Sequence, residues 1–320
     1  SMFHLMSYLD LEDGVLYAEG GFTRVIDSMR EVIEDHGVTI MTNTKVNAIA
    51  TERVRGKARA TGVTYKESDG HTHTLSADIV VSTTDLHHSE TQLLPEELQT
   101  YPQKWWDKKV AGPSAVLLYL GVKGEVPELL HHSLFFTEDW DDNFSQIFAD
   151  KPTVPSPASL YVCKPSATDS SVAPKGHTNL FVLVPMPADV TLGHGGLNGS
   201  GDPAVEGIAD RAIEQIIKWS GASDLAERIV LRRSVGPADF AGDLNAWKGT
   251  ALGPAHILTQ SALFRAGNIS KKVDGLFYAG SSTIPGIGLP MCLISAEVLL
   301  KRVRGDVSTG PLPTPLMPVS

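Results

Sequence analysis

The segment near the carboxyl end is the part of this sequence best suited to hold a ligand. Gly280, Gly286 and Gly288 punctuate it, and mostly small or apolar residues lie between them. We expect a strand to lead into this turn and a helix over about 291–303 to leave it, which would present free backbone N–H groups at a concave surface. Such a surface suits an anionic group, and glycine lets that group approach the backbone. An ordinary tight strand-to-helix connection is the alternative.

Neighbouring histidines and two cysteines are the other candidate metal ligands. The histidines form three pairs: His71 and His73, His87 and His88, and His131 and His132. No pair has a third and a fourth ligand at a recognisable spacing, so we interpret these side chains as solvated and predict no metal site. Cys163 and Cys292 are too few for a zinc cage and are not spaced as a redox pair.

The remaining polar candidates are ambiguous. The carboxylates of Asp10, Glu12 and Asp13 could transfer protons, but a polar turn before a strand also explains their grouping. Arg265 could orient a substrate or cofactor through its fork of donors, or form a structural ion pair. No GxSxG nucleophile elbow occurs and neither cysteine has a nearby histidine motif, so acyl transfer has no support in the sequence. The glycine-rich segment also lacks the GxGxxG spacing, which occurs nowhere in the chain.

Composition narrows the class of protein. With 320 residues, of which 42% are hydrophobic and 20% charged, the chain can bury a large core. Its net charge of -10 works against a nucleic-acid partner. No apolar run approaches the length of a membrane-spanning helix, and the scarcity of cysteine fits a reducing compartment. We therefore expect a cytoplasmic protein whose membrane contact, if it has any, is peripheral.

Apolar periodicity predicts the elements that must position these residues. An amphipathic helix is expected over 22–35, followed by short strands at 38–41 and 45–49, a hairpin through 60–75 that turns at Ser68, Asp69 and Gly70, and a buried strand at 77–82. From about residue 89 aromatic residues gather, and strands are expected at 114–120, 159–163 and 178–184, then a helix at 203–219. The aromatic side chains could line an apolar cavity, although such clusters more often form core.

Several segments together are similar to one known family. Near the carboxyl end they are Gly236-Pro-Ala-Asp-Phe, Leu258-Thr-Gln-Ser-Ala-Leu-Phe-Arg and Tyr278-Ala-Gly-Ser-Ser-Thr-Ile-Pro-Gly-Ile-Gly-Leu-Pro. Upstream they are Leu9-Asp-Leu-Glu-Asp-Gly-Val-Leu-Tyr-Ala-Glu-Gly-Gly-Phe and Ala77-Asp-Ile-Val-Val-Ser-Thr-Thr-Asp. In this order they resemble segments of the bacterial and fungal phytoene desaturases, and the resemblance covers most of the chain.

The resemblance implies a two-domain flavoprotein of the α/β (α+β) class. A partial, Rossmann-like FAD-binding domain of the flavin amine oxidase type would comprise residues 15–88 and 236–305. A substrate-binding domain with a mixed sheet, residues 89–235, would be inserted between these parts. Residues 1–14 would end another segment of the substrate domain, and 306–320 would form a disordered tail.

The resemblance also assigns residues to the cofactor. Gly20 and Gly21 would approach the flavin, the backbone of Val46 would meet the adenine, and the carboxyl-terminal turn would embrace the rest. The residues that it assigns in this turn are Gly280, Ser281, Ser282, Pro285, Gly286, Gly288, Leu289, Pro290 and Met291. The sequence departs from the family where Ile284 replaces a frequent His and Met291 a frequent Gly. The family's amino-terminal βαβ unit is not found, so we expect this chain by itself to lack FAD and to be inactive.

The function implied is FAD-dependent dehydrogenation of a carotenoid or related long polyene, by hydride transfer to the flavin. Carotene isomerases, saturases and oxygenases of the same fold are the alternatives. A scaffold without catalytic activity that has lost its cofactor is an alternative from another class. The sequence gives no indication of the oligomeric state.

Overall fold

The computed structural model describes residues 16–67, 70–149 and 151–313. Residues 1–14, including Asp10, Glu12 and Asp13, and the turn residues Ser68 and Asp69 therefore lie outside the described residues. The helices are α2 (Phe22–Asp35), α3 (Leu86–Gln92), α4 (Gln103–Trp106), α5 (Trp140–Phe148), α6 (Pro203–Ser220), α7 (Leu225–Arg228), α8 (Pro237–Leu244) and α9 (Leu289–Arg304). The strands are β1 (Lys45–Val54), β2 (Lys57–Lys66), β3 (Thr72–Ser76), β4 (Val80–Ser82), β5 (Ser114–Lys123), β6 (His132–Phe135), β7 (Leu160–Cys163), β8 (His177–Met186), β9 (Ile229–Val235), β10 (Val273–Asp274) and β11 (Leu276–Tyr278).

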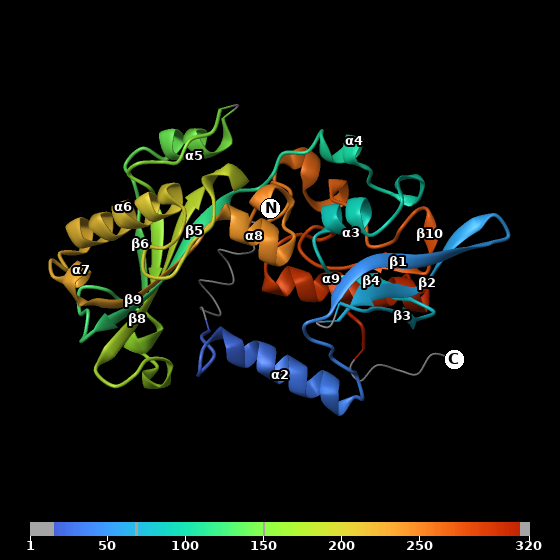
Figure 1. Ribbon diagram of the computed structural model, residues 1–320, viewed down its shortest axis with the longest axis horizontal. Coiled ribbons are helices and arrows are strands. Elements are labelled where there is room, and N and C mark those ends of the chain that lie inside the picture. Colours follow the sequence, from blue (N-terminus) through green and yellow to red (C-terminus); the bar gives the residue numbers. More distant parts are fainter. Residues whose placement is uncertain (1–15, 68–69, 150, 314–320) are drawn as a thin grey trace.

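A five-stranded sheet with the order β6-β7-β8-β5-β9 forms one part of the molecule. Every pairing in it is antiparallel, so the expected mixed pairing is not found in this sheet. The strands β8 and β9 both run opposite to β5, which lies between them, and α6 lies in the connection from one to the other. A helical crossover thus joins two strands of the same direction without pairing them. Figure 1 shows α6 and α7 on one side of this sheet.

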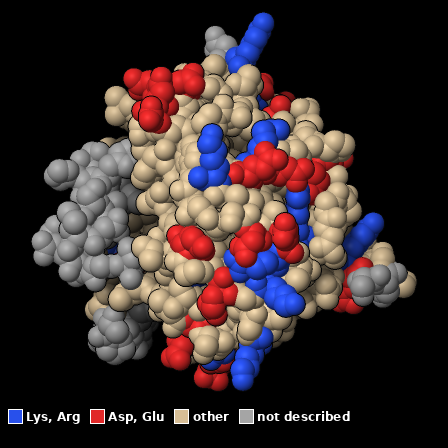
Figure 2. Space-filling model, turned by 90° about the vertical axis from the view of Figure 1, so that its left-hand side faces the viewer, with Lys and Arg blue, Asp and Glu red and all other residues tan. Residues whose placement is uncertain are grey.

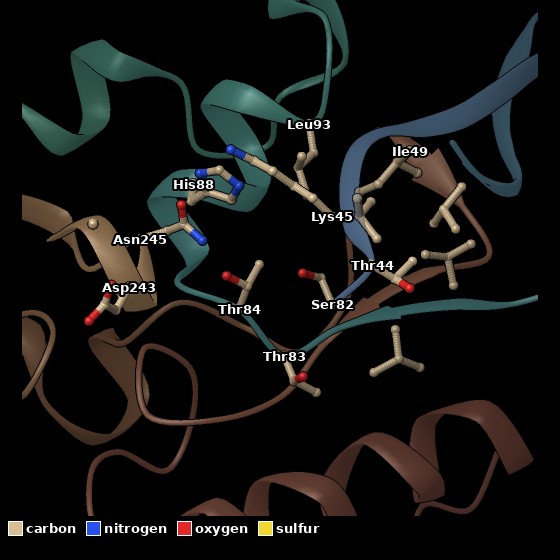
Figure 3. Close-up of a pocket in the computed structure, with 15 residues that line it drawn as sticks. Thr44, Lys45, Ile49, Ser82, Thr83, Thr84, His88, Leu93, Asp243 and Asn245 are labelled. Carbon is tan, nitrogen blue, oxygen red and sulfur yellow. The ribbon is translucent and has the colours of Figure 1, made fainter. Parts of the chain in front are cut away.

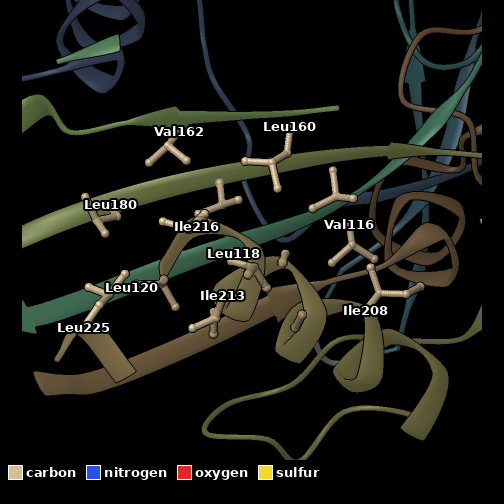
Figure 4. Close-up of a cluster of buried hydrophobic side chains, with 14 of the residues drawn as sticks. Val116, Leu118, Leu120, Leu160, Val162, Leu180, Ile208, Ile213, Ile216 and Leu225 are labelled. Carbon is tan, nitrogen blue, oxygen red and sulfur yellow. The ribbon is translucent and has the colours of Figure 1, made fainter. Parts of the chain in front are cut away.

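The core of this part lies between α6 and the sheet. Along β8, buried residues alternate with half-buried ones, as a strand with one covered face requires. The side chains of Val116, Leu118 and Val162 point from the sheet toward Ile213 and Ile216 of α6 (Figure 4). Each buried aliphatic side chain of this size contributes about 1.5–3 kcal/mol by leaving water.

A second part is built around two smaller sheets (Figure 1). The strand β2 pairs with β1 in an antiparallel hairpin; it also pairs with β10, in parallel, near its start, and with β3, antiparallel, along its later residues. The parallel pair of β4 and β11 forms the other sheet. Their core contains Leu86, Trp106, Leu276 and Tyr278, so the two expected segments around residues 80 and 276 share one hydrophobic cluster.

The first helix confirms the prediction from its periodicity, but it does not cover a core. The helix α2 ends before Gly37, which has a positive φ of 77°. Its apolar residues Phe22, Ile26 and Val32 are exposed. The strand predicted at 38–41 is wrong: these residues form no strand and are exposed, and no described strand lies beside them to satisfy their backbone groups.

The surface carries charges of both signs. On the face with the five-stranded sheet and α6, acidic and basic side chains are interspersed (Figure 2). Some of them form ion pairs, such as Arg232 with Glu206 and Asp210, both at 2.5 Å. Within the part of the chain that the structure describes, no helix has both the length and the apolar character needed to cross a bilayer.

Candidate functional site

The predicted strand, turn and helix near the carboxyl end are present as β11, residues 279–288 and α9. The strand β11 lies parallel to β4, and the backbone N–H of Ala279 donates to the carbonyl oxygen of Ser82 at 3.1 Å. The carboxyl ends of both strands therefore meet at one edge. In α/β proteins with parallel sheets, ligands bind just outside the carboxyl ends of the strands.

The glycines of the turn adopt conformations that other residues avoid. The φ angles are 112° at Gly280, 146° at Gly286 and 105° at Gly288. A Cβ atom at Gly286 would lie 2.9 Å from the ring of His256, whereas one at Gly288 would meet nothing within 4 Å. Gly288 and the following Leu289 and Pro290 are exposed. The start of α9 is thus open, and no side chain of the described residues caps it.

A buried polar network holds this turn against α9. The Oγ atom of Ser295, on α9, accepts from the backbone N–H of Gly280 at 3.1 Å and from Nδ2 of Asn268 at 3.1 Å, and it lies 3.0 Å from Oγ1 of Thr283. Nδ2 of Asn268 also lies 3.1 Å from the carbonyl oxygen of Tyr278 and 3.3 Å from that of Ile284, so its two N–H donors are shared among these acceptors. All of these partners are fixed, so the turn is preorganised. The sequence analysis did not identify Asn268 or Ser295 as supporting residues. The only indication in the sequence was the polar Ser295 within the apolar run of α9.

Arg265 stabilises the turn through hydrogen bonds to backbone carbonyl oxygens. Its side chain is only 5% exposed, and the guanidinium donates to the carbonyl oxygen of Ser281 through Nε at 3.1 Å and Nη2 at 2.6 Å. Nη1 donates to the carbonyl oxygens of Pro254 and Gln260. Burial lowers the pKa of this guanidinium to about 10, so it remains a cation at neutral pH. These contacts are to backbone carbonyl oxygens, and a contact between Arg265 and a substrate stays a prediction.

A cavity of about 500 Å³ lies beside the carboxyl end of β4 (Figure 3). Val46 of β1 lines it, as does its neighbour Lys45, whose side chain extends toward His88. Burial is the main cause that lowers the pKa of His88; the carboxylate of Asp85 opposes this shift, and the ammonium of Lys45 adds to it. The walls combine apolar side chains with hydroxyl, amide and amine groups.

A second cavity of about 400 Å³ adjoins the first. Both are lined by the same four residues, Thr83, Thr84, Asp243 and Asn245. The second also contains Ser281 and Ser282 of the glycine-rich turn. The two cavities therefore connect the surroundings of Val46 to the start of the turn, and their volumes are within the range of ordinary ligand sites.

Asp85 lines the second cavity and is the N-cap residue of α3. Its carboxylate accepts from the backbone N–H groups of His87 at 2.8 Å and Trp247 at 3.3 Å. Burial raises the pKa of Asp85, and these backbone N–H groups lower it in part. The carboxylate thus ties the start of α3 to the backbone at Trp247.

A second buried carboxylate, Glu90, links α3 to β11. It accepts from the Tyr278 hydroxyl and, at 2.8 Å, from the backbone N–H of Tyr101. Burial raises the pKa of Glu90, and burial together with this carboxylate raises the pKa of Tyr278. Because Tyr278 is the last residue of β11 and directly precedes the turn, Glu90 fixes the strand from which the turn departs.

Gly20 and Gly21 lie elsewhere in the described structure. The backbone N–H of Gly20 donates to Oδ2 of Asp169 at 2.7 Å, and a Cβ atom at Gly21 would lie 3.9 Å from Val172. Both glycines have positive φ angles and precede α2. They contact the loop after β7 and are not among the residues that line the two cavities. Their approach to a flavin stays a prediction.

The residues present fit a large cofactor with a phosphate-bearing linker. An exposed helix start with an open position at Gly288 suits an anionic group. Beside Gly286, both ring nitrogens of His256 are buried without a hydrogen-bond partner among the described residues. A bound molecule could satisfy such groups. The adjoining cavities extend this site toward Val46.

Among the curated proteins that this chain resembles, several have names that describe them as carotenoid or phytoene desaturases. The chain is 40% identical over 308 residues to a carotenoid 3,4-desaturase of Haloarcula japonica, covering 96% of this chain and 58% of the relative. It is 32% identical to a zeta-carotene-forming phytoene desaturase of Myxococcus xanthus, covering 95% and 55%. These relatives confirm the resemblance found from the sequence. The chain spans a little over half of their length.

Solved structures agree on the fold. An oxidoreductase from Methanosarcina mazei superposes with a TM-score of 0.52 at 18% identity, covering 88% of this chain and 55% of that one. A protein from Pyrococcus furiosus gives a TM-score of 0.51 at 16% identity, covering 91% and 54%. Helices and strands are combined as the α/β (α+β) prediction requires. A sequence profile of the family described as flavin containing amine oxidoreductase matches residues 1–297. The chain therefore belongs to the family of flavin-containing amine oxidoreductases.

Proposed function

We propose that the full-length protein containing this chain is an FAD-dependent oxidoreductase that dehydrogenates a carotenoid or a related long polyene. The observation that carries the proposal is the open, glycine-rich turn at residues 280–291, which lies beside two adjoining cavities at the carboxyl ends of parallel strands. The names of the relatives support the substrate class. Because the chain covers 58% of the Haloarcula relative, the activity is proposed for a polypeptide that also contains the relatives' remaining part.

The residues that would hold FAD come from three places. Backbone N–H groups of Leu289 and Met291, at the start of α9, would face its phosphates, and Ser281 and Ser282 would line its path. Val46 would lie at the far end of the first cavity. When bound, the flavin supplies an acceptor for hydride from an unactivated carbon. The 320-residue chain alone is proposed to lack FAD, since it contributes part of the site.

The face of the five-stranded sheet opposite α6 is the proposed substrate surface. Tyr119 and Phe181 contact each other on this face with ring centroids 5.5 Å apart, and Tyr161 lies 6.4 Å from Phe181. An apolar cavity of about 530 Å³ includes Tyr119, Phe181 and Leu231. A polyene has no polar group to bind, so this surface would orient it by shape and exclude water. The exposed ring stack of Phe136, Trp140 and Phe144 lies elsewhere, at α5.

Product analysis tests the proposal. Full-length protein is incubated with FAD and phytoene or a partly desaturated carotene, and the extracted pigments are separated and their spectra recorded. A desaturase gives products with red-shifted absorption, because each new double bond lengthens the conjugated system. Products with unchanged length of conjugation would indicate an isomerase, shortened conjugation a saturase, and added oxygen an oxygenase. A colourless full-length protein without product would favour the scaffold.

Contact with a membrane surface is part of the proposal, because a carotenoid substrate is insoluble in water. Full-length protein is mixed with lipid vesicles and centrifuged through a density gradient. Flotation with the vesicles supports the contact, and retention of all protein in the dense fraction contradicts it.

A further inference from the structure

The five-stranded sheet brings together three potential metal ligands that are far apart in the sequence. His132 begins the edge strand β6, and antiparallel pairing places it directly opposite Cys163, the last residue of β7. His131 precedes β6, and its ring lies 4.4 Å from that of His132. One ligand atom from each of His131, His132 and Cys163 lies within 4.8 Å of the others. The sequence offered two adjacent histidines; the pairing of β6 with β7 supplies the thiol.

The hydrogen bonds of the two histidines leave the opposite ring nitrogens available. Nδ1 of His131 lies 2.7 Å from Oγ1 of Thr168, and Nδ1 of His132 lies 2.7 Å from the hydroxyl of Tyr161. If Nδ1 of each ring is the donor, Nε2 carries a free lone pair. A metal-bound histidine is held in this way by a partner on its other nitrogen.

Nε2 of His131 is an independent indication of a ligand. It is buried and has no hydrogen-bond partner among the residues that the structure describes. A buried nitrogen without a partner is costly, and a metal ion would satisfy it.

We propose that His131, His132 and Cys163 bind one divalent ion of the zinc class. Two imidazoles and one thiolate form a donor set that suits zinc, and the three ligands leave a fourth tetrahedral position for water. A tetrahedral site needs ligand atoms roughly 3.3–3.7 Å apart, so the group must contract by about 1 Å. The exposed side chain of His132 can make that movement. Binding releases the thiol proton of Cys163 to solvent and changes no oxidation state.

The ion would join the edge strand to the segment that holds α2. Tyr17 packs edge-on against His131 with ring centroids 4.8 Å apart, and its hydroxyl donates to Asp169 at 3.3 Å. Asp169 in turn accepts from the backbone N–H of Gly20. The site therefore lies where the loop after β7 meets the start of α2, away from the two cavities near the glycine-rich turn. It does not depend on the proposed function.

Cobalt titration of the protein tests the proposal. Protein freed of metal by a chelator is titrated with Co²⁺, and the thiolate-to-cobalt charge-transfer absorption in the near ultraviolet is recorded. We expect one equivalent to bind with this absorption and one equivalent of Zn²⁺ to abolish it. In Cys163→Ser the absorption should be lost, and in Cys163→Ser and His131→Ala the affinity for Zn²⁺ should fall by at least about 100-fold. Thr168→Val, which removes the partner of His131, should weaken binding about 10-fold.

Two control variants keep the test specific. Cys292→Ser removes the other free cysteine, on α9, and His177→Ala removes a histidine outside the cluster; both should bind as the unaltered protein does. Circular dichroism of every variant without metal establishes that it is folded. Absence of the thiolate absorption in the unaltered protein, or equal zinc affinity in folded Cys163→Ser, would overturn the proposal. Binding lost only in Cys292→Ser would overturn it too.

Discussion

Removal of the Ser295 hydroxyl should loosen the turn that we assign to the cofactor. In Ser295→Ala the half-buried backbone N–H of Gly280 loses its acceptor, and the buried Asn268 and Thr283 each lose one contact. An orphaned buried donor costs about 1–3 kcal/mol. Since Asn268 and Thr283 keep other partners, we expect a total loss of about 2 kcal/mol in the free energy of unfolding. At about 2–4 °C for each kcal/mol, the melting temperature should fall by roughly 4–8 °C.

Urea unfolding at 25 °C measures this loss, with Ser28→Ala as the matched control. The Ser28 hydroxyl donates to a carbonyl oxygen on the exposed helix α2, so its removal should change the free energy by less than about 0.5 kcal/mol. In a double-mutant cycle, Ser295→Ala and Asn268→Ala should couple by about 1 kcal/mol because they share one network. A loss in Ser295→Ala no larger than the control, or strict additivity with Asn268→Ala, would show that the Ser295 hydroxyl does not hold the turn.

Glu90, Arg265 and Gly288 lie in or support the same turn, and the effects of replacing each of them can be measured. Burial raises the pKa of Glu90 above 4.5, so the contribution of this carboxyl group to stability is greatest below that pH and is lost as pH rises through the folded-state pKa. In urea titrations the unaltered protein should therefore lose stability from pH 4 to pH 8 relative to Glu90→Gln. Parallel pH profiles of the two proteins would contradict this. Arg265→Lys should cost about 2–3 kcal/mol of unfolding free energy, since lysine cannot reach three carbonyl groups; unchanged stability with a raised KM would favour a substrate contact instead. Gly288→Ala and Gly305→Ala, at the two ends of α9, should each lower the free energy of unfolding by about 1 kcal/mol because both glycines have positive φ. In a fluorescence titration of the full-length protein, only Gly288→Ala should weaken FAD binding. Equal affinities of the two variants for FAD would contradict the assignment of Gly288 to the cofactor site.

Local patterns were sufficient for several elements. The apolar spacing from Phe22 predicted α2, and the glycine-rich segment predicted β11, the turn and α9, because turn glycines and helical periodicity are local properties. The strand predicted at 38–41 failed, since its apolar residues have no described partner strand. A strand needs a neighbour, and a short apolar run does not specify one.

The supporting contacts could not be read from the sequence. Asn268 and Ser295 meet only after the chain has folded back from β11 to α9, and Glu90 reaches Tyr278 across a far longer separation. The walls of the cavities likewise come from segments around residues 45, 83, 243 and 281. Cys163 joins the histidines only through the register of β6 and β7. Long-range pairings of this kind depend on topology rather than on local pattern.

Hydrogen exchange measures whether bound FAD faces the glycine-rich turn. Full-length protein is freed of flavin, and amide exchange is followed by mass spectrometry with and without added FAD. We expect peptides covering residues 280–291 and 44–46 to gain protection when FAD binds, because their backbone groups face it. Peptides from α6 should not change. Saturating FAD binding that leaves residues 280–291 exchanging at the rate of the flavin-free protein would contradict the account.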